Sequence, residues 1–266
     1  MTTQTWINPV KATLKAGRPV VAATITSTSI DAAAQLATLG FDFLWIEMEH
    51  SPVTLETLRH MVLATRGLKA VPFARVPVNE LWTAKRVLDA GVHGVIFPFT
   101  STPELAAQAA AACKYPPHGR RGSGGGLARF AWQVDDYTES ADQNVVVIVI
   151  IEEARAVDNI DAIAATPGID VMFIGTSDLS FSLGLRGRQN EPALNDAIQK
   201  VLEAGKRHGK AVGRPAMSAE KVKEWIDQGF QLFQAPTDLG FMTAGAKRYL
   251  EPLEKAVELA QAKTLY

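Results

Sequence analysis

The stretch Val145-Val-Val-Ile-Val-Ile-Ile-Glu152 places a carboxylate directly after a continuous run of branched apolar residues. A second apolar run, Val171-Met-Phe-Ile, continues through Gly-Thr-Ser to another carboxylate, Asp178. Runs of this length, rich in valine and isoleucine, are typical of parallel strands that are buried on both faces. Because parallel α/β proteins place their sites at the carboxyl ends of strands, both carboxylates are candidate functional groups.

Short apolar strands alternate with amphipathic helices along the whole chain. The pattern predicts strands at residues 20–24, 43–47, 70–75, 94–97, 145–151, 171–174, 211–214 and 232–235. Helices are predicted near residues 31–39, 54–66, 79–90, 102–113, 154–165, 191–208, 218–228 and 239–262. Eight such units in 266 residues predict an α/β protein with a single (β/α)8 TIM barrel spanning residues 1–266. The alternative, a doubly wound open sheet, normally has a glycine-rich turn after its first strand, and residues 24–29 contain no glycine.

The overall composition narrows the class of protein. With 47% hydrophobic and 21% charged residues the chain reads as soluble and globular, and a formal net charge of −1 favours neither nucleic acid nor an anionic membrane as partner. The single cysteine, Cys113, excludes an internal disulfide and fits a reducing compartment. The first six residues lack the basic start and apolar core of a signal peptide, so we expect a cytoplasmic protein.

Polar side chains stand at the ends of several predicted strands, which meet at one mouth in a closed barrel. The oxygen ligands that divalent cations prefer are available from Glu152 and Asp178, although each carboxylate could instead cap the following helix. The turn after Gly175 can present backbone N–H groups to an anion beside such a cation. A wet barrel mouth is polar in any case, so the argument rests on the combined set of residues.

The same set includes a candidate base and candidate cations. Next to the carboxylates Glu47 and Glu49 lies His50, a residue type that commonly acts as a general base near neutral pH. At the end of a buried strand, Arg75 needs an anionic partner from the protein or from a substrate. Asp89 on the next helix and the strand-end cation Arg214 complete the set. For Asp89 the sequence pattern alone favours a structural role.

One connection, residues 114–144, is much longer than the others. It is rich in glycine, arginine and aromatic residues, and long segments of this kind are usually lids, binding loops or interfaces. We interpret it as a flexible lid that carries Arg121, or as an interface segment. No lysine occupies a strand's carboxyl end, so the sequence argues against Schiff-base chemistry.

Together these motifs resemble the metal-dependent class II pyruvate aldolases of the 4-hydroxy-2-oxoheptanedioate aldolase type, a family with 2-dehydro-3-deoxyglucarate aldolases and, more distantly, citrate lyase β subunits. The resemblance covers roughly residues 15–250 and rests on Glu47-Met-Glu-His50, Arg75, Leu88-Asp-Ala-Gly91, Tyr115-Pro-Pro-x-Gly-x-Arg-Gly122, Ile151-Glu152 and Phe173-Ile-Gly-x-x-Asp-Leu-Ser180. It implies a TIM barrel assembled as a hexamer, in which the C-terminal helix, about residues 239–262, packs on a neighbouring subunit.

The resemblance also implies roles for particular residues. It assigns Glu152 and Asp178 as ligands of Mg²⁺, Mn²⁺ or Co²⁺, with no organic cofactor. It places Arg75 beside the keto oxygen of pyruvate and makes His50 the base, supported by Asp89 and Glu47. The backbone N–H groups around Gly175, Thr176 and Ser177 would hold the pyruvate carboxylate. Partners are then a small 2-oxo acid and an aldehyde.

Five positions depart from the family's pattern: Ile150 in place of a frequent glutamine, Thr176-Ser177 in place of Pro-Ala, Glu47 in place of aspartate, and Arg214 at a position that is often apolar. These departures leave the pyruvate chemistry intact and the acceptor aldehyde undetermined. A citramalyl-CoA or malyl-CoA type lyase with the same metal site is the alternative activity. A non-catalytic barrel is the third reading, although it has no need for His50, Arg75 and the two metal-binding carboxylates together.

Overall fold

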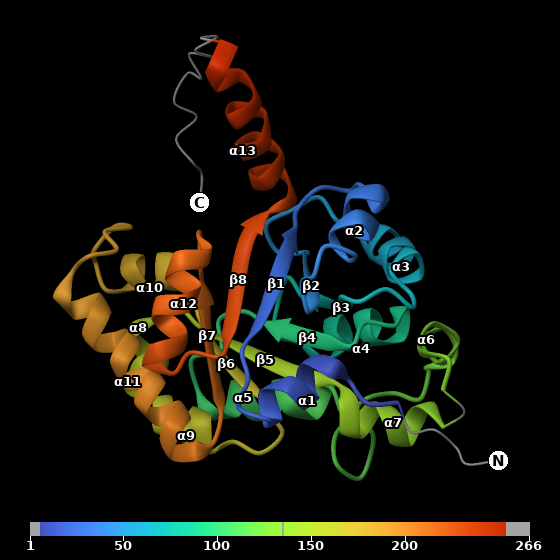
Figure 1. The fold of residues 1–266 in the computed structure, drawn as a ribbon. Coiled ribbons are helices and arrows are strands. Elements are labelled where there is room, and N and C mark those ends of the chain that lie inside the picture. Colours follow the sequence, from blue (N-terminus) through green and yellow to red (C-terminus); the bar gives the residue numbers. More distant parts are fainter. Residues whose placement is uncertain (1–5, 135, 254–266) are drawn as a thin grey trace.

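A computed structural model describes residues 6–134 and 136–253, and its centre is a closed barrel of parallel strands (Figure 1). Each strand pairs with its neighbours in sequence order, and the last strand closes on the first. The strands are β1 (Val20–Ile25), β2 (Phe43–Glu47), β3 (Val71–Arg75), β4 (Gly94–Phe97), β5 (Val146–Ile151), β6 (Val171–Ile174), β7 (Ala211–Pro215) and β8 (Leu232–Thr237). The predicted TIM barrel is confirmed, and the open-sheet alternative is wrong.

Helices surround the barrel, as the amphipathic patterns predict. Their bounds are α1 (Pro9–Lys15), α2 (Ile30–Leu36), α3 (Leu55–Ala64), α4 (Leu81–Ala90), α5 (Pro103–Ala112), α6 (Gly126–Trp132), α7 (Tyr137–Asn144), α8 (Ala154–Asp158), α9 (Ile160–Ala165), α10 (Thr176–Ser182), α11 (Pro192–His208), α12 (Ala219–Gln228) and α13 (Asp238–Leu250). The helix predicted near residues 154–165 is divided into α8 and α9 at Asn159. Cys113, at the end of α5, is buried in the core.

The alternation of side chains along each strand separates the core into two parts. One apolar cluster fills the barrel interior and includes Phe43, Phe73, Ile150 and Phe173, whereas a larger one lies between the strands and the helices. Because successive side chains of a strand point to opposite faces, the inward series continues two residues at a time to the strand ends. This parity directs the side chains of Glu47, Arg75 and Glu152 toward the mouth of the barrel.

The long connection at residues 114–144 is more ordered than the predicted lid. It contains α6 and α7, and its Arg121 side chain is buried with 1% exposure. The guanidinium donates to Asp89 and to the Tyr137 hydroxyl, and it also stacks over Tyr115. A charge held by this many partners is fixed in place. The described contacts of Arg121 are thus internal to the fold, and the interpretation of the segment as a lid or an interface stays a prediction.

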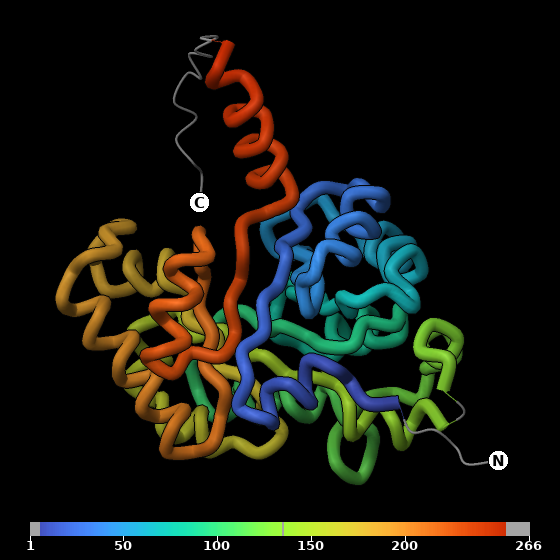
Figure 2. Tube along the Cα trace, viewed as in Figure 1, coloured from blue at the N-terminus to red at the C-terminus, as the bar shows by residue number. Residues whose placement is uncertain are grey.

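The C-terminal helix α13 extends away from the barrel, as the tube in Figure 2 shows. Its first turn is anchored by Asp238, whose carboxylate accepts hydrogen bonds from the backbone N–H groups of Thr26 and Ser27. Beyond that turn the side chains are mostly exposed. The predicted helix runs to about residue 262, but residues 254–266 lie outside the described part of the chain. Among the described residues, no helix has the length and apolar character needed to cross a membrane.

Candidate active site

A single guanidinium stands at the centre of the barrel mouth. The Arg75 side chain, at the end of β3, lies with Nη1 3.4 Å from Glu47 Oε2 and with Nη2 3.5 Å from Glu152 Oε2. The same Nη2 makes a close ion pair with Glu49. All four side chains are almost fully buried, so one arginine faces three carboxylates in a site with little solvent.

The loop after β2 is organised around Glu47. One carboxylate oxygen, Oε1, accepts hydrogen bonds from the backbone N–H groups of Glu49 at 2.8 Å and His50 at 3.2 Å. The other oxygen faces Arg75 and accepts a hydrogen bond from the indole Nε1 of Trp45 at 3.3 Å. Because these contacts use both oxygens, Glu47 holds the following residues in place as well as pairing with Arg75.

Glu49 makes two contacts, one with Arg75 and one with His50. From the sequence, this residue was considered only as a neighbour of His50. Its Oε2 faces both Arg75 Nη2 and, at 3.5 Å, His50 Nε2. Burial raises the pKa of the Glu49 carboxyl to about 7; Arg75 opposes this shift, while the charges of Glu47 and Asp178 add to it. The signal available in the sequence was the Glu-x-Glu-His spacing, which does not distinguish the roles of the two glutamates.

The carboxylate at the end of β5 is held by its surroundings. Glu152 Oε1 accepts a hydrogen bond from the backbone N–H of Phe99 at 2.6 Å. That residue has φ of 47°, a left-handed conformation that costs about 1–3 kcal/mol for a residue with a side chain. Across the mouth, a Cβ at Gly175 would lie 2.9 Å from Glu152 Cβ, so only glycine leaves space for this side chain. Burial raises the pKa of Glu152 to about 7, against the opposing effect of Arg75.

The remaining predicted residues of this group lie around the first turn of α10. The carboxylate of Asp178 is exposed, yet its charge contributes to the raised pKa values of Glu49 and Glu152. The N–H of Gly175 donates to Ile151 O at 3.1 Å within the sheet. The N–H groups of Thr176 and Ser177 belong to the first turn of α10, where the helix itself supplies no acceptor.

Two further predicted residues lie in other surroundings. The described contact of Asp89 is its ion pair with Arg121 at 3.1 Å, and its Oδ2 lies where a Cβ of Gly124 would be 3.0 Å away. The strand-end cation Arg214 has the opposite parity to the inward residues of β7. Its guanidinium stacks 3.7 Å from the centre of the Trp225 ring, outside the barrel. Counting Arg214 among the groups that meet at the mouth was therefore wrong.

A divalent cation fits the charge balance of this mouth. The carboxylates of Glu47, Glu49 and Glu152 share one arginine, and the charge of Asp178 also acts on two of them. The raised pKa values of Glu49 and Glu152 reflect burial and negative charge that Arg75 does not offset. The Nε of Arg75 is a buried donor without a hydrogen-bond partner in residues 6–134 and 136–253. Within those residues no three His, Cys, Asp or Glu side chains already converge as metal ligands. The residues that would hold the cation are therefore Glu152 and Asp178, with water or substrate completing the shell.

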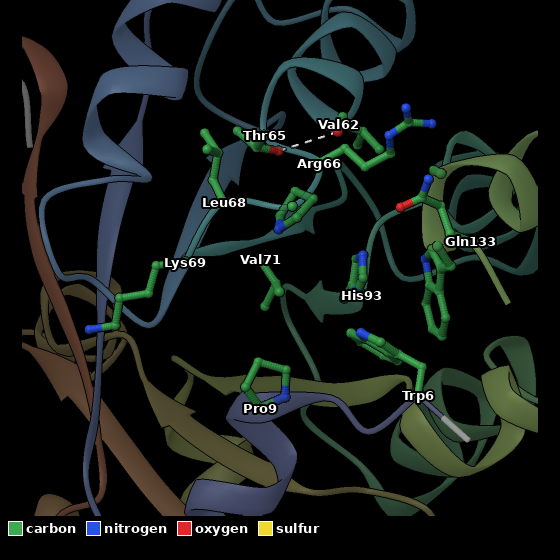
Figure 3. Close-up of a pocket in the computed structure, with 14 residues that line it drawn as sticks. Trp6, Pro9, Val62, Thr65, Arg66, Leu68, Lys69, Val71, His93 and Gln133 are labelled. Atoms are coloured by element: carbon green, nitrogen blue, oxygen red, sulfur yellow. Dashed lines mark hydrogen bonds between the residues drawn. The ribbon is translucent and has the colours of Figure 1, made fainter. Parts of the chain in front are cut away.

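A pocket of about 350 Å³ lies elsewhere, near the amino ends of β3 and β4 (Figure 3). Its walls include Trp6 and Trp132, and the ring of His93 stacks on that of Trp132 at 4.5 Å. Burial lowers the pKa of His93 to about 3, so this imidazole is neutral. Among the described residues no carboxylate lines the pocket, and it lies at the end of a TIM barrel that usually supports stability rather than catalysis. We therefore place the chemistry at the mouth.

Comparisons with known proteins identify the family of this chain. The family model for HpcH/HpaI aldolase/citrate lyase matches residues 25–244. A 5-keto-4-deoxy-D-glucarate aldolase of Salmonella arizonae is 37% identical over 221 residues, which cover 83% of this chain and 86% of that protein. A crystal structure of a family member from Burkholderia cenocepacia J2315 has a TM-score of 0.87 and 35% identity, covering 92% of this chain and 99% of the other.

A third comparison shows that related barrels carry more than one kind of carbon–carbon chemistry. The citrate synthase SbnG is 28% identical with a TM-score of 0.82, and the match covers 91% of this chain and 96% of SbnG. The family model spans most of the chain, and the named aldolase relative covers more than two thirds of it. The chain therefore belongs to the HpcH/HpaI aldolase/citrate lyase family and is a lyase of the aldolase type.

Proposed function

We propose that the barrel mouth is the active site of a divalent-metal-dependent aldolase that reversibly cleaves 4-hydroxy-2-oxo acids to pyruvate and an aldehyde. One observation carries the proposal: Arg75 lies within ion-pair distance of Glu47, Glu49 and Glu152 at the buried end of the barrel. This arrangement combines one fixed guanidinium with three carboxylates, whose excess negative charge would favour binding of a cation. The cation is Mg²⁺, Mn²⁺ or Co²⁺, held by Glu152 and Asp178.

Cleavage of a 4-hydroxy-2-oxo acid breaks the bond between C3 and C4 and leaves its electron pair on the pyruvate half as an enolate. When bound, the cation supplies Lewis-acid stabilisation of the negative charge that develops on the keto oxygen. The Arg75 guanidinium donates to the same oxygen from a fixed position, which is effective because the donor needs no reorganisation during reaction.

The other groups divide the remaining tasks. The imidazole of His50 accepts the proton of the 4-hydroxyl as the aldehyde forms, and returns it in the synthetic direction. The backbone N–H groups of Thr176 and Ser177 bind the pyruvate carboxylate, and Gly175 keeps space beside Glu152. In this scheme Glu47 orders the loop that carries His50, and a supporting role for Asp89 rests on the family resemblance alone.

The substrate class follows the relative's activity. We infer that the natural substrate is a 4-hydroxy-2-oxo sugar acid, because an aldolase for 5-keto-4-deoxy-D-glucarate is 37% identical over 83% of the chain. A citramalyl-CoA or malyl-CoA type lyase is a different activity that the same metal site could carry, and cleavage of such thioesters would support it. Measuring release of pyruvate from both substrate classes distinguishes the two activities.

Two assays test the metal and the base. Chelation should abolish cleavage, and Mg²⁺, Mn²⁺ or Co²⁺ should restore it; full activity in chelator together with inactivation by borohydride and pyruvate would contradict the metal assignment. The substitution His50→Ala should reduce cleavage by about 10²–10⁴-fold. It should spare oxaloacetate decarboxylation, which also forms a pyruvate enolate but removes no 4-hydroxyl proton. Equal losses in both reactions would contradict the role of His50.

We also infer that the chain forms a homo-oligomer, for which the resemblance implies a hexamer. Large apolar side chains on α13 are exposed, among them Met242 at 64% and Tyr249 at 76%. A second copy of the chain would cover them, as is common for apolar surface on a projecting helix. The substitution Met242→Glu should reduce the molar mass measured by light scattering, whereas Lys247→Glu, on the same helix, serves as the control. An unchanged mass in Met242→Glu would contradict this role for α13.

A further inference from the structure

One carboxylate oxygen touches two groups with separate tasks. Glu49 Oε2 lies in an ion pair with Arg75 Nη2 and 3.5 Å from His50 Nε2. The Glu49 side chain is 10% exposed and that of His50 is 39% exposed. The buried carboxylate is thus a fixed point between the guanidinium assigned to the keto oxygen and the imidazole assigned to the 4-hydroxyl.

The other acidic residues do not occupy this position. Glu47 uses Oε1 to accept two backbone N–H groups and Oε2 to meet Arg75 and Trp45. Glu152 faces Arg75 and the Phe99 N–H. Without Glu49, Arg75 could shift between Glu47 and Glu152, and the half-exposed imidazole of His50 has rotational freedom to lose. The contact of Glu49 with both restricts both movements.

We propose that Glu49 is a positioning residue that holds Arg75 and His50 in one geometry. Arg75 can then bind the keto oxygen while His50 accepts the proton of the 4-hydroxyl as the C3–C4 bond breaks. The inference rests on the proposed function and adds a residue to it. It follows from the geometric demand of the reaction, because a displacement of about 1 Å in a positioned group can cost roughly 10²-fold in rate.

The test is a double-mutant cycle with two reactions. Glu49→Gln keeps the shape of the side chain and removes its charge, and we expect cleavage to fall about 10²-fold. Oxaloacetate decarboxylation, which depends on Arg75 but not on His50, should fall by a smaller factor. In the His50→Ala background, Glu49→Gln should reduce cleavage only by that smaller factor, because the part acting through His50 is already lost.

Three controls make the result interpretable. Cleavage by the wild-type protein tests the proposed function separately. If the wild-type protein does not cleave the substrate, the proposed function is rejected before the Glu49 variants are compared. Glu56→Gln, an exposed glutamate on α3, controls for loss of one negative charge. Glu49→Asp keeps the charge but shortens the side chain, so it should lie between wild type and Glu49→Gln. Equal losses from Glu49→Gln with and without His50, or wild-type rates in both Glu49 variants, would overturn the proposal.

Discussion

The two ends of β5 use carboxylates in opposite ways. At its start, Asp170 Oδ2 accepts a hydrogen bond from the Val147 N–H at 2.9 Å, and the carboxylate pairs with Lys11 at 3.2 Å. At its end, Glu152 shares one guanidinium with two other glutamates and has a pKa raised to about 7. The first carboxylate stabilises the fold, whereas burial of the second costs the fold free energy whenever that carboxyl is charged.

At the opposite, amino end of the barrel, one buried polar side chain has its hydrogen bonds satisfied by neighbouring backbone groups. The buried side chain of Asn8 donates to the carbonyls of His93 and Asn144 at 3.0 and 2.9 Å, and it accepts from the N–H of Val10. These contacts tie α1 to the strands above it. The comparison teaches that incomplete compensation of buried charge marks the reactive end of this barrel, since active sites retain strain that the remaining fold supports.

The largest effect is expected at the mouth. Glu152→Gln should reduce cleavage by about 10³–10⁵-fold, because a divalent cation contributes several kcal/mol to enolate stabilisation and this substitution removes a ligand. The metal-free variant should be at least as stable as the metal-free wild type at pH 8, because a buried negative charge is gone. Activity assays and urea unfolding check both parts. If the Glu152→Gln variant is active but less stable than wild type, then Glu152 stabilises the fold and is not a reactive group.

Arg75→Lys should have the next largest effect. The ammonium keeps the charge but lacks the planar fork that meets Glu47 and Glu152 through different nitrogens, so the rate should fall about 10²–10³-fold. Steady-state kinetics with saturating Mg²⁺ provide the measurement. Near-wild-type kcat in Arg75→Lys and Arg75→Ala would mean that this arginine only balances charge.

A smaller effect, on stability, is expected at the amino end. Asn8→Ala removes a buried donor from the carbonyls of His93 and Asn144, although the His93 carbonyl keeps the Val146 N–H, and it also removes the acceptor that caps α1. The free energy of unfolding should therefore fall by about 2–4 kcal/mol. The rate per folded molecule should not change. Ser29→Ala removes an exposed N-cap of α2 and serves as the matched control, with a loss of about 1 kcal/mol. A loss no larger than in the control would show that the Asn8 network adds little to capping.

The smallest effect is a pH dependence at the amino end. Since the pKa of His93 is lowered from 6.5 to about 3, the folded state keeps this imidazole neutral while the unfolded chain takes up a proton below pH 6.5. Its contribution is therefore present above pH 6.5 and is lost at roughly 1.4 kcal/mol per pH unit as pH falls toward 3. Unfolding free energies at pH 7 and 5 should differ less in His93→Gln than in wild type. The exposed His60→Gln should leave the difference unchanged.

The sequence predicted most of the fold and the composition of the site. The bounds of the predicted strands and of most predicted helices agree within a few residues, because apolar periodicity is a local property of each segment. The helices α1, α6, α7 and α10 were not predicted, and the end of the helix predicted at residues 239–262 lies outside the described residues. The mouth contains Glu47, Arg75 and Glu152 as predicted, since strand parity and barrel closure bring them together. The sequence did not predict that Arg121 is buried against Asp89 and Tyr137, because glycine and arginine content does not reveal contacts made across the fold.

By itself, then, the sequence determined that eight buried strands form a barrel and that carboxylates follow two of them. Only the tertiary structure decided which oxygen meets which nitrogen. Arg214 lies outside the barrel because its side chain points away from the inward face of β7. Glu49 forms its ion pair with Arg75, which is 26 positions away in the sequence. The reason is physical: periodicity depends on neighbours along the chain, whereas ion pairs and burial depend on strand register and on side chains brought together when the barrel closes.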